Sequence, residues 1–304
     1  MSLTFTSPPS TLTVDSALER AILSTLAYSD IFDHPLTLDE LHKFLVIPST
    51  KEEIAACISS LPHVKFKDDY CFLTDRPEIV DIRRAREANS RKAFRRAMHY
   101  GRIIGNLPFI RMVALTGSLA MLNLSKHRDV DFLLVAKPGH VWTARAFALV
   151  FGRLVRLFGD VICPNVIISE KALAWGEKDL YSAREFAQMI PISGLHVFAK
   201  LQDANSWVKE ILPNHSVQVI LSEVKYLHAR NKFQTFIEWL LTNKLAARFE
   251  SWEMTRKIAR FKDQKGYGVE TNFSADVCQG NFDHHGAWTM KMYQERLRTI
   301  QGAS

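Results

Sequence analysis

The chain contains few cysteines, and they are scattered. Its 304 residues include four, at positions 57, 71, 163 and 278, and no two of them form a Cys-x-x-Cys pair. A disulfide framework or a cysteine-rich zinc site is therefore not expected, and a reducing, cytoplasmic environment fits this usage.

Long apolar runs without charge are also missing. The most apolar stretch, residues 141–158, is interrupted by three arginines, whereas a transmembrane helix needs about 20 nearly uncharged residues. Residues 1–16 show no basic segment followed by an apolar one, so they do not resemble a secretory signal. We therefore expect no membrane partner, and we expect residues 141–158 to form a buried helix.

The overall composition is that of a globular protein. The hydrophobic fraction is 47% and the charged fraction 23%, and at roughly 100–200 residues per domain the length indicates two or three domains. The net charge of +7 and the pI near 9.2 suit a polyanionic partner such as a nucleotide or nucleic acid. They fit a mildly basic soluble protein equally well.

Residues 1–16, rich in Ser, Thr and Pro, predict a flexible tail, and residues 17–76 predict a winged-helix-like domain. Apolar residues at helical spacing mark a first helix over residues 17–28. Two further helices begin at capping boxes, and two short apolar runs at 64–66 and 70–73 flank a turn and predict a hairpin. The capping boxes pair Thr37 with Glu40 and Thr50 with Glu53.

Winged helices commonly bind DNA through their third helix. Here that helix begins Lys51-Glu52-Glu53, and the turn of the wing carries Asp68 and Asp69. Little positive charge is therefore available for phosphates. A protein-interaction or packing role is favoured over DNA binding for this domain.

Residues 77–106 predict a strongly basic connecting helix. One helix cannot bury so many cations, so most of them should face solvent or an anion. The helix is either a solvated linker or a phosphate-facing wall beside the site that follows, and nucleic acid is a candidate partner. Its basic residues are Arg83, Arg84, Arg86, Arg91, Lys92, Arg95, Arg96 and Arg102.

The segment of residues 112–135 carries the chemistry. A short strand precedes Gly117 and Ser118, which turn the chain into a helix. Glycine permits a close backbone approach, and the free N–H groups of the turn, with the Ser118 hydroxyl, suit a phosphate. After a polar loop, Asp129 and Asp131 begin an apolar strand, and because alternate strand residues share a face, both carboxylates point the same way.

Two carboxylates on one face repel each other unless a cation joins them. Their hard oxygen atoms suit Mg²⁺, or Mn²⁺ in its place, and Mg²⁺ is commonly held by one or two carboxylates plus substrate phosphates. A phosphate-binding turn opposite a divalent-metal site is the arrangement that metal-dependent nucleotidyl transfer requires.

Residues 107–178 resemble the core of the DNA-polymerase-β-like nucleotidyltransferase superfamily. Its signature is an apolar strand, Gly-Gly or Gly-Ser, a loop and helix, and then Asp-x-Asp, and both halves match here. The resemblance implies that Gly117 and Ser118 hold the triphosphate of an NTP and that Asp129 and Asp131 ligate the metal ions. The loop before the acids adds two basic residues that either contact phosphate or are exposed loop charges, Lys126 and Arg128.

The superfamily usually has a third acid on a later strand, which deprotonates the attacking hydroxyl. The equivalent position here is Asn165, whose amide can bind a metal but cannot act as a base. Asp160 and Glu170 flank that strand and are candidate substitutes. Pro164 predicts an edge position or a bulge for the strand.

Residues 179–304 predict a helical C-terminal region with a glycine-rich tail. Cys278, His284 and His285 in this tail are of types that bind zinc, but no second pair completes a four-ligand set. Ordinary packing therefore competes with a metal site there. The polar, turn-rich composition motivates the hypothesis that the tail folds back over the nucleotide site.

Together these features predict an α/β (α+β) protein, with a small mixed-sheet nucleotidyltransferase core, an N-terminal winged helix and a helical C-terminal region. The leading hypothesis is metal-dependent transfer of an NMP group from an NTP to an unidentified acceptor, with release of pyrophosphate. A second is a catalytically impaired nucleotide sensor that acts through the winged helix, which Asn165 motivates. A third is nucleic-acid binding through the basic helix.

Overall fold

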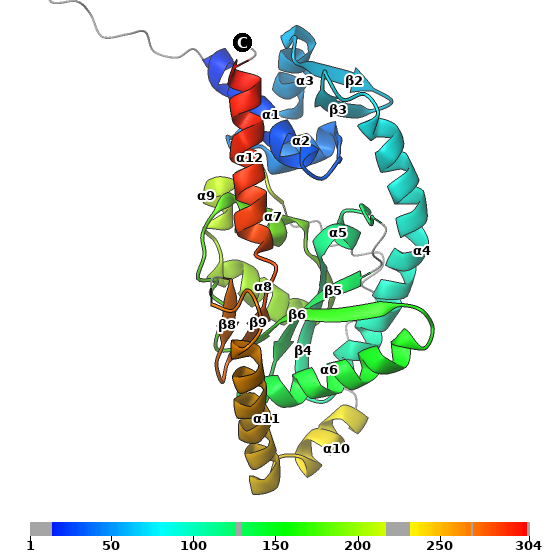
Figure 1. Ribbon diagram of the computed structural model, residues 1–304, viewed down its shortest axis with the longest axis vertical. Coiled ribbons are helices and arrows are strands. Elements are labelled where there is room, and N and C mark those ends of the chain that lie inside the picture. The colour runs from blue at the N-terminus through cyan, green and yellow to red at the C-terminus, as the bar shows by residue number, and fades with distance from the viewer. Residues whose placement is uncertain (1–13, 126–128, 217–231, 269, 303–304) are drawn as a thin grey trace, which may run out of the picture.

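The computed structural model describes residues 14–125, 129–216, 232–268 and 270–302. Within these ranges the protein is a mixed α/β structure, with twelve helices, a three-stranded antiparallel sheet and a six-stranded mixed sheet. The small sheet lies at one end of the molecule and the larger sheet near its middle (Figure 1). Of the predicted tail, residues 1–13 lie outside the described ranges, and the first helix begins at Val14.

The N-terminal unit contains the expected three helices and hairpin, with one additional strand. Both predicted capping boxes are present, at Thr37 and at Thr50. The additional strand pairs with the hairpin and gives the sheet order β1-β3-β2. The elements are α1 (Val14–Asp30), β1 (Leu36–Thr37), α2 (Leu38–Phe44), α3 (Lys51–Ser60), β2 (Val64–Lys67) and β3 (Tyr70–Leu73).

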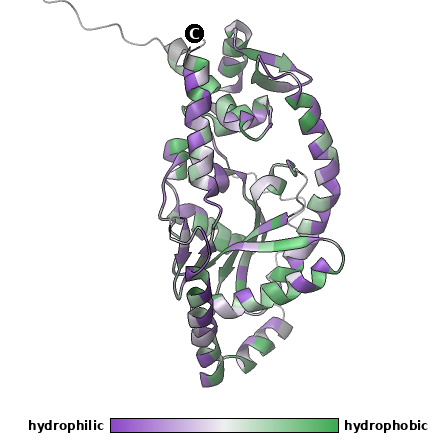
Figure 2. Cartoon of the chain, viewed as in Figure 1, coloured by the Kyte–Doolittle hydropathy of each residue, from purple (hydrophilic) through white to green (hydrophobic). Residues whose placement is uncertain are grey.

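The basic connecting helix is α4 (Ile79–Gly105), which runs along one side of the molecule from the small sheet to the large one (Figure 1). Hydrophilic and hydrophobic residues are interspersed along it (Figure 2). As expected, most of its cations are exposed or half-buried, and Arg83 is the buried exception. Arg83 is buried and bound by Glu40 at 2.6 Å and Glu87 at 3.0 Å, and Arg96 meets the buried Asp160 at 2.6 Å.

The order predicted for the central segment is confirmed. Strand β4 pairs antiparallel with β5, and α6 connects β5 to the parallel strand β6. The expectation of a buried helix over residues 141–158 holds only in part. Trp142 and Ala144 of α6 are fully buried, whereas Val150 and Leu154 are more than half exposed. The elements are β4 (Ile110–Thr116), α5 (Gly117–Ala120), β5 (Asp129–Ala136), α6 (Val141–Arg156) and β6 (Val161–Ser169).

The C-terminal region is not purely helical, which corrects the prediction. Three short strands from it join the large sheet, giving the order β7-β4-β5-β6-β9-β8. They complete the open sides of β4 and β6, whose unpaired backbone groups would otherwise be left at sheet edges. The elements are α7 (Leu180–Gln188), β7 (Ile190–Ser193), α8 (Leu195–Ala204), α9 (Val208–Ile211), α10 (Lys232–Leu240), α11 (Lys244–Lys262), β8 (Thr271–Phe273), β9 (Val277–Gly280) and α12 (His285–Gly302).

Strand β6 accommodates Pro164 in a bulge, one of the two predicted alternatives. The β5–β6 register passes from Asp131 opposite Cys163 to Leu133 opposite Val166, so two residues of β6 face one of β5. The strand is not at the edge of the sheet, but β9 pairs only with residues 166–168. No ladder bond is therefore required of Pro164, and the bulge re-aims Asn165.

The last helix, α12, returns to the N-terminal unit and packs beside α1 (Figure 1). The Tyr293 ring meets Tyr28 edge-on at 5.7 Å between centroids, and Arg296 binds the buried Asp30 at 2.7 Å. These contacts attach the last helix of the described chain to the N-terminal unit. Within the described ranges, no helix combines the length and apolar character that crossing a membrane requires.

The paired arginines of α4 make a testable prediction about stability. Replacing Arg83 with Met leaves the carboxylates of Glu40 and Glu87 without their cation and should lower the free energy of unfolding by about 3–5 kcal/mol in a urea titration. Arg84→Met is the matched control, because Arg84 is half-exposed and meets the exposed Asp68 at 3.0 Å. Its loss should cost less than about 1 kcal/mol. Equal losses in the two variants would contradict this account of α4.

Candidate functional site

A cleft of about 550 Å³ lies where the strand ends of the large sheet meet α7 and the C-terminal segment. Its size is within the range of small-molecule sites. The turn after β4, the start of β5 and the bulge of β6 supply one wall, and residues 270–289 supply another. Every predicted site residue that the structure describes lines this cleft: Gly117, Ser118, Asp129, Asp131 and Asn165.

The Gly117 turn is held against the second acid. Gly117 has a φ of +66°, and a Cβ atom there would lie 2.6 Å from Oδ2 of Asp131. The two strands place them together, because Thr116 is the register partner of Asp131. Only glycine fits this backbone conformation without strain and also leaves room for the carboxylate. Ser118 follows at the exposed start of α5, and no hydrogen bond within the described residues engages its hydroxyl.

Asp129 and Asp131 lie on one face of β5, as the alternation predicts. Burial and the charge of Asp129 raise the pKa of Asp131 to about 7, although a hydrogen bond from Asn165 opposes the shift. None of the ion pairs among the described residues neutralises either acid. The site therefore concentrates negative charge beside a turn shaped for close approach.

Asn165 binds directly to one of these acids. Its Nδ2 donates to Oδ1 of Asp131 at 2.6 Å, and its Oδ1 accepts a hydrogen bond from the Cys163 thiol at 2.8 Å. The bulge of β6 thus directs this side chain into the cleft. A neutral amide occupies the position where the resemblance implies a third acid.

The two acids considered as substitutes for Asn165 are in the wrong places. Asp160 is buried and accepts hydrogen bonds from Arg96 at 2.6 Å and the Tyr100 hydroxyl at 2.7 Å, both on α4. Glu170 lies 4.0 Å from Arg111. Neither lines the cleft, because each lies beyond an end of the segment that pairs with Asp129 and Asp131.

Glu185 on α7 is the acid that sequence analysis missed. It lines the cleft, and burial together with the charge of Asp131 raises its pKa to about 7, against a hydrogen bond from Gln188. The sequence carries no signal for it, because Glu185 lies on the side of α7 away from the apolar residues Ala183, Phe186 and Ala187.

The C-terminal segment covers one side of the cleft, in agreement with the hypothesis that the tail folds back over it. Asn281, His285 and Trp288 line the cleft, and Glu270 accepts the backbone N–H groups of Gly286 and Ala287 at the start of α12. Glu270 thereby fixes the turn into α12. The segment is a structural wall of the cleft.

Of the two alternatives for the tail, ordinary packing holds and the zinc-type cluster does not assemble. Cys278 is buried in the core of the large sheet. His284 does not line the cleft, whereas His285 does and lies 3.9 Å from Asp283. Across the described residues, no group of three or more His, Cys, Asp or Glu side chains is placed to hold a metal ion.

Two sets of basic residues were candidates for phosphate contact, the loop before Asp129 and helix α4. Lys126 and Arg128 lie outside the described residues. No residue of α4 lines the cleft, so of the two alternatives for this helix the phosphate-facing wall is wrong. Arg83 instead binds Glu40 of the N-terminal unit, and Arg96 binds Asp160 just before β6.

The donor atoms of the cleft are of the kind that Mg²⁺ prefers. Asp129 and Asp131 offer hard carboxylate oxygens on one face, and burial together with the charge of Asp129 raises the pKa of Asp131. Two carboxylates without a third protein ligand suit a metal ion whose remaining ligands are phosphate oxygens and water. The residues fit Mg²⁺, or Mn²⁺, bound together with a phosphorylated substrate.

The raised pKa of Asp131 predicts how stability depends on pH. Because the folded-state pKa lies above the unfolded value, the native protein loses stability as the pH rises from about 4 to about 7. Asp131→Asn keeps the neutral form, so in the presence of EDTA it should be more stable than wild type above pH 7, by about 1–2 kcal/mol after allowance for solvent screening. The difference should shrink as the pH falls toward 4.

Asp160→Asn is the control for this measurement. Like Asp131, Asp160 is an aspartate of the large sheet region, but Arg96 and Tyr100 donate hydrogen bonds to it. Its replacement should therefore destabilise the protein at neutral pH. Chemical denaturation at a series of pH values measures both variants. Destabilisation by Asp131→Asn above pH 7 would contradict the described electrostatics of the cleft.

Comparisons with known proteins found no relative. No protein-family model matches the chain, and neither a curated protein nor a solved structure does. The interpretation of the cleft therefore depends on its residues and their geometry.

Proposed function

We propose that the protein is a Mg²⁺-dependent nucleotidyltransferase that moves an NMP group from an NTP to an acceptor and releases pyrophosphate. The observation that carries the proposal is the contact between the Gly117 turn and Asp131. A Cβ atom at Gly117 would lie 2.6 Å from the carboxylate oxygen, so the turn that would hold phosphates and the acid that would hold metal are in direct contact. Phosphates and metal are thereby brought together.

The roles of the residues follow from their positions. The backbone at Gly117 and the exposed hydroxyl of Ser118 bind the triphosphate, and the adjacent Asp129 and Asp131 would hold the metal. A bound metal would neutralise charge that develops on the phosphates during transfer. Asn165 orients Asp131 through its hydrogen bond of 2.6 Å.

Glu185 takes the place of the third acid. It lines the same cleft from α7, so it can accept the proton of the attacking acceptor hydroxyl, which Asn165 cannot. The acceptor oxygen then bonds to the α-phosphorus. The bond from that phosphorus to the bridging oxygen breaks, and pyrophosphate leaves.

We interpret the N-terminal unit as a winged helix, on its three helices and three-stranded antiparallel sheet. It contributes Phe32 to the cleft, which favours a second candidate function. In that alternative the protein senses Mg²⁺·NTP without turnover and transmits binding through this unit. Asn165 beside Asp131 supports it, because its neutral amide cannot act as a base.

Gly117 gives the sharpest test of nucleotide binding. Gly117→Ala should weaken Mg²⁺·NTP binding at least tenfold in calorimetric titration, because the new methyl group must displace the Asp131 carboxylate. Gly139→Ala is the matched control. Gly139 has a similar φ of +74°, but a Cβ there meets nothing within 4 Å.

Both variants should lose about 1 kcal/mol of stability from the strained backbone. Only Gly117→Ala should lose nucleotide affinity. If wild type binds no NTP in the presence of Mg²⁺, or if the two variants bind alike, the proposed site is wrong.

A further inference from the structure

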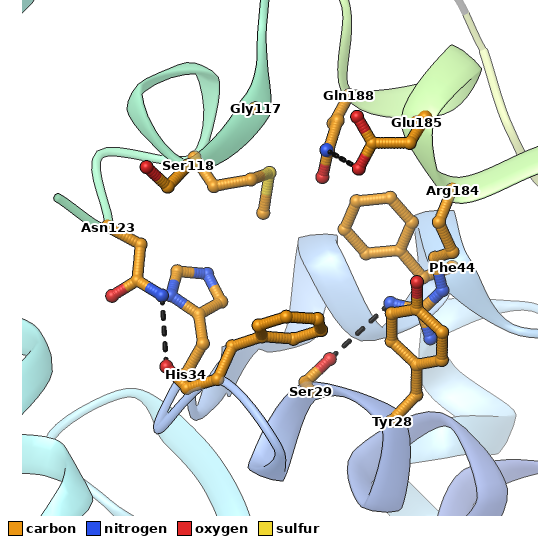
Figure 3. Close-up of a pocket in the computed structure, with 12 residues that line it drawn as sticks. Tyr28, Ser29, His34, Phe44, Gly117, Ser118, Asn123, Arg184, Glu185 and Gln188 are labelled. Atoms are coloured by element: carbon orange, nitrogen blue, oxygen red, sulfur yellow. Dashed lines mark hydrogen bonds between the residues drawn. The ribbon is translucent and has the colours of Figure 1, made fainter. Parts of the chain in front are cut away.

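A second, smaller cavity lies behind the Gly117 turn, between the N-terminal unit and α7. It has a volume of about 120 Å³ and is referred to here as the chamber. Gly117, Ser118 and Glu185 line both the chamber and the cleft, so the two spaces share a wall. Figure 3 shows Ser118 at one end of the chamber and Arg184 at the other, beside the Tyr28 and Phe44 rings.

Arg184 is a buried cation without an acidic partner. Its side chain is 4% exposed, and none of the ion pairs of the described residues includes it. Its Nη atoms reach the Ser29 hydroxyl and the Thr25 carbonyl only at 3.4 Å, and its Nε has no hydrogen-bond partner. Burial lowers its pKa to about 10, so the guanidinium stays charged at neutral pH.

Arg83 is buried to the same extent as Arg184 but has acidic partners. It is also 4% exposed, but it donates to both oxygens of Glu40 and to Glu87. Arg184 instead lies 4.5 Å from the centroids of Tyr28 and Phe44. Aromatic faces attract a cation but carry no net charge, and buried cations are normally paired with an anion.

The rest of the chamber is suited to a small organic molecule. Phe32, Phe44 and Met121 provide apolar surface, and the Gln188 amide and the Ser118 hydroxyl provide polar groups. The shared wall at Glu185 would bring a molecule bound here next to the proposed transfer site. The chamber thus combines a charged end, an apolar middle and a wall shared with the cleft.

We propose that the chamber binds the acceptor, a small organic anion whose carboxylate or phosphate pairs with Arg184 and whose hydroxyl points toward the wall formed by Ser118 and Glu185. This inference rests on the proposed nucleotidyl transfer for the identity of the ligand as acceptor. The acceptor hydroxyl gives its proton to Glu185, its oxygen bonds to the α-phosphorus of the NTP, and pyrophosphate carries away the electron pair of the broken bond. Such a substrate makes the transfer product a nucleotidylated small acid.

Two probes test which anionic group pairs with Arg184. Benzoate carries a carboxylate, and phenyl phosphate carries a phosphate. Calorimetric titration of the full chain should show binding of at least one probe, weakened at least tenfold by Arg184→Met. Arg96→Met is the control, because Arg96 binds Asp160 and lines neither the chamber nor the cleft. It should leave probe binding unchanged. Binding of neither probe by wild type, or equal binding by Arg184→Met, would overturn the proposal.

Two further measurements keep the result interpretable. If Arg184→Met does not fold, nuclear Overhauser effects from the bound probe to the rings of Tyr28 or Phe32 in wild type must place the probe in the chamber, and contacts elsewhere would refute the assignment. The Asp129→Asn/Asp131→Asn variant should keep probe binding while losing Mg²⁺·NTP. Probe binding with no NTP binding by wild type would leave an anion chamber but remove the transferase, so the two failures are distinguishable.

Discussion

The approach of Asp131 to the Gly117 turn is the constraint on which the cleft depends. A carboxylate and a backbone turn cannot be this close unless residue 117 lacks a side chain. Strand pairing enforces the approach, since Thr116 and Asp131 are register partners. Asp129 is then placed on the same face of β5 two residues earlier. The result is a pair of acids, without a cation among the described residues, next to a turn that only glycine can form.

Buried ion pairs hold the surroundings of that pair in place. Arg83 joins α4 to α2 through Glu40, Arg96 joins it to the start of β6 through Asp160, and Arg296 joins α12 to α1 through Asp30. These links connect the N-terminal unit to the sheet without using any residue of the cleft. The chamber lies between the parts so connected, and Arg184 is the buried arginine there whose charge the described protein leaves unmatched.

Features of the fold and the cleft that depend on residues close together in the sequence could be predicted from it. The capping boxes at Thr37 and Thr50, the Gly117 turn and the common face of Asp129 and Asp131 are set by residues a few positions apart, and each is present in the structure. The bulge at Pro164 follows from the missing N–H of proline.

What depended on distant partners was not readable. The role of Glu185 requires knowing that α7 faces the start of β5, and the burial of Arg83 requires knowing that Glu40 lies opposite it. Strands β7, β8 and β9 are three or four residues long and gain their structure from the edges they complete, so their own composition gives little signal. For the same reason Asp160 looked available as a catalytic acid, although α4 binds it.

The central claim is that this cleft transfers a nucleotidyl group, and the most direct measurement follows the α-phosphate itself. Each NTP, labelled with ³²P at the α-phosphate, is incubated with Mg²⁺, the protein and a protein-free extract of small metabolites. The account predicts that label enters a new product together with release of pyrophosphate, and that both are lost in Asp129→Asn/Asp131→Asn and in Glu185→Gln. Binding of Mg²⁺·NTP without any conversion, or conversion that survives loss of both aspartates, would contradict it.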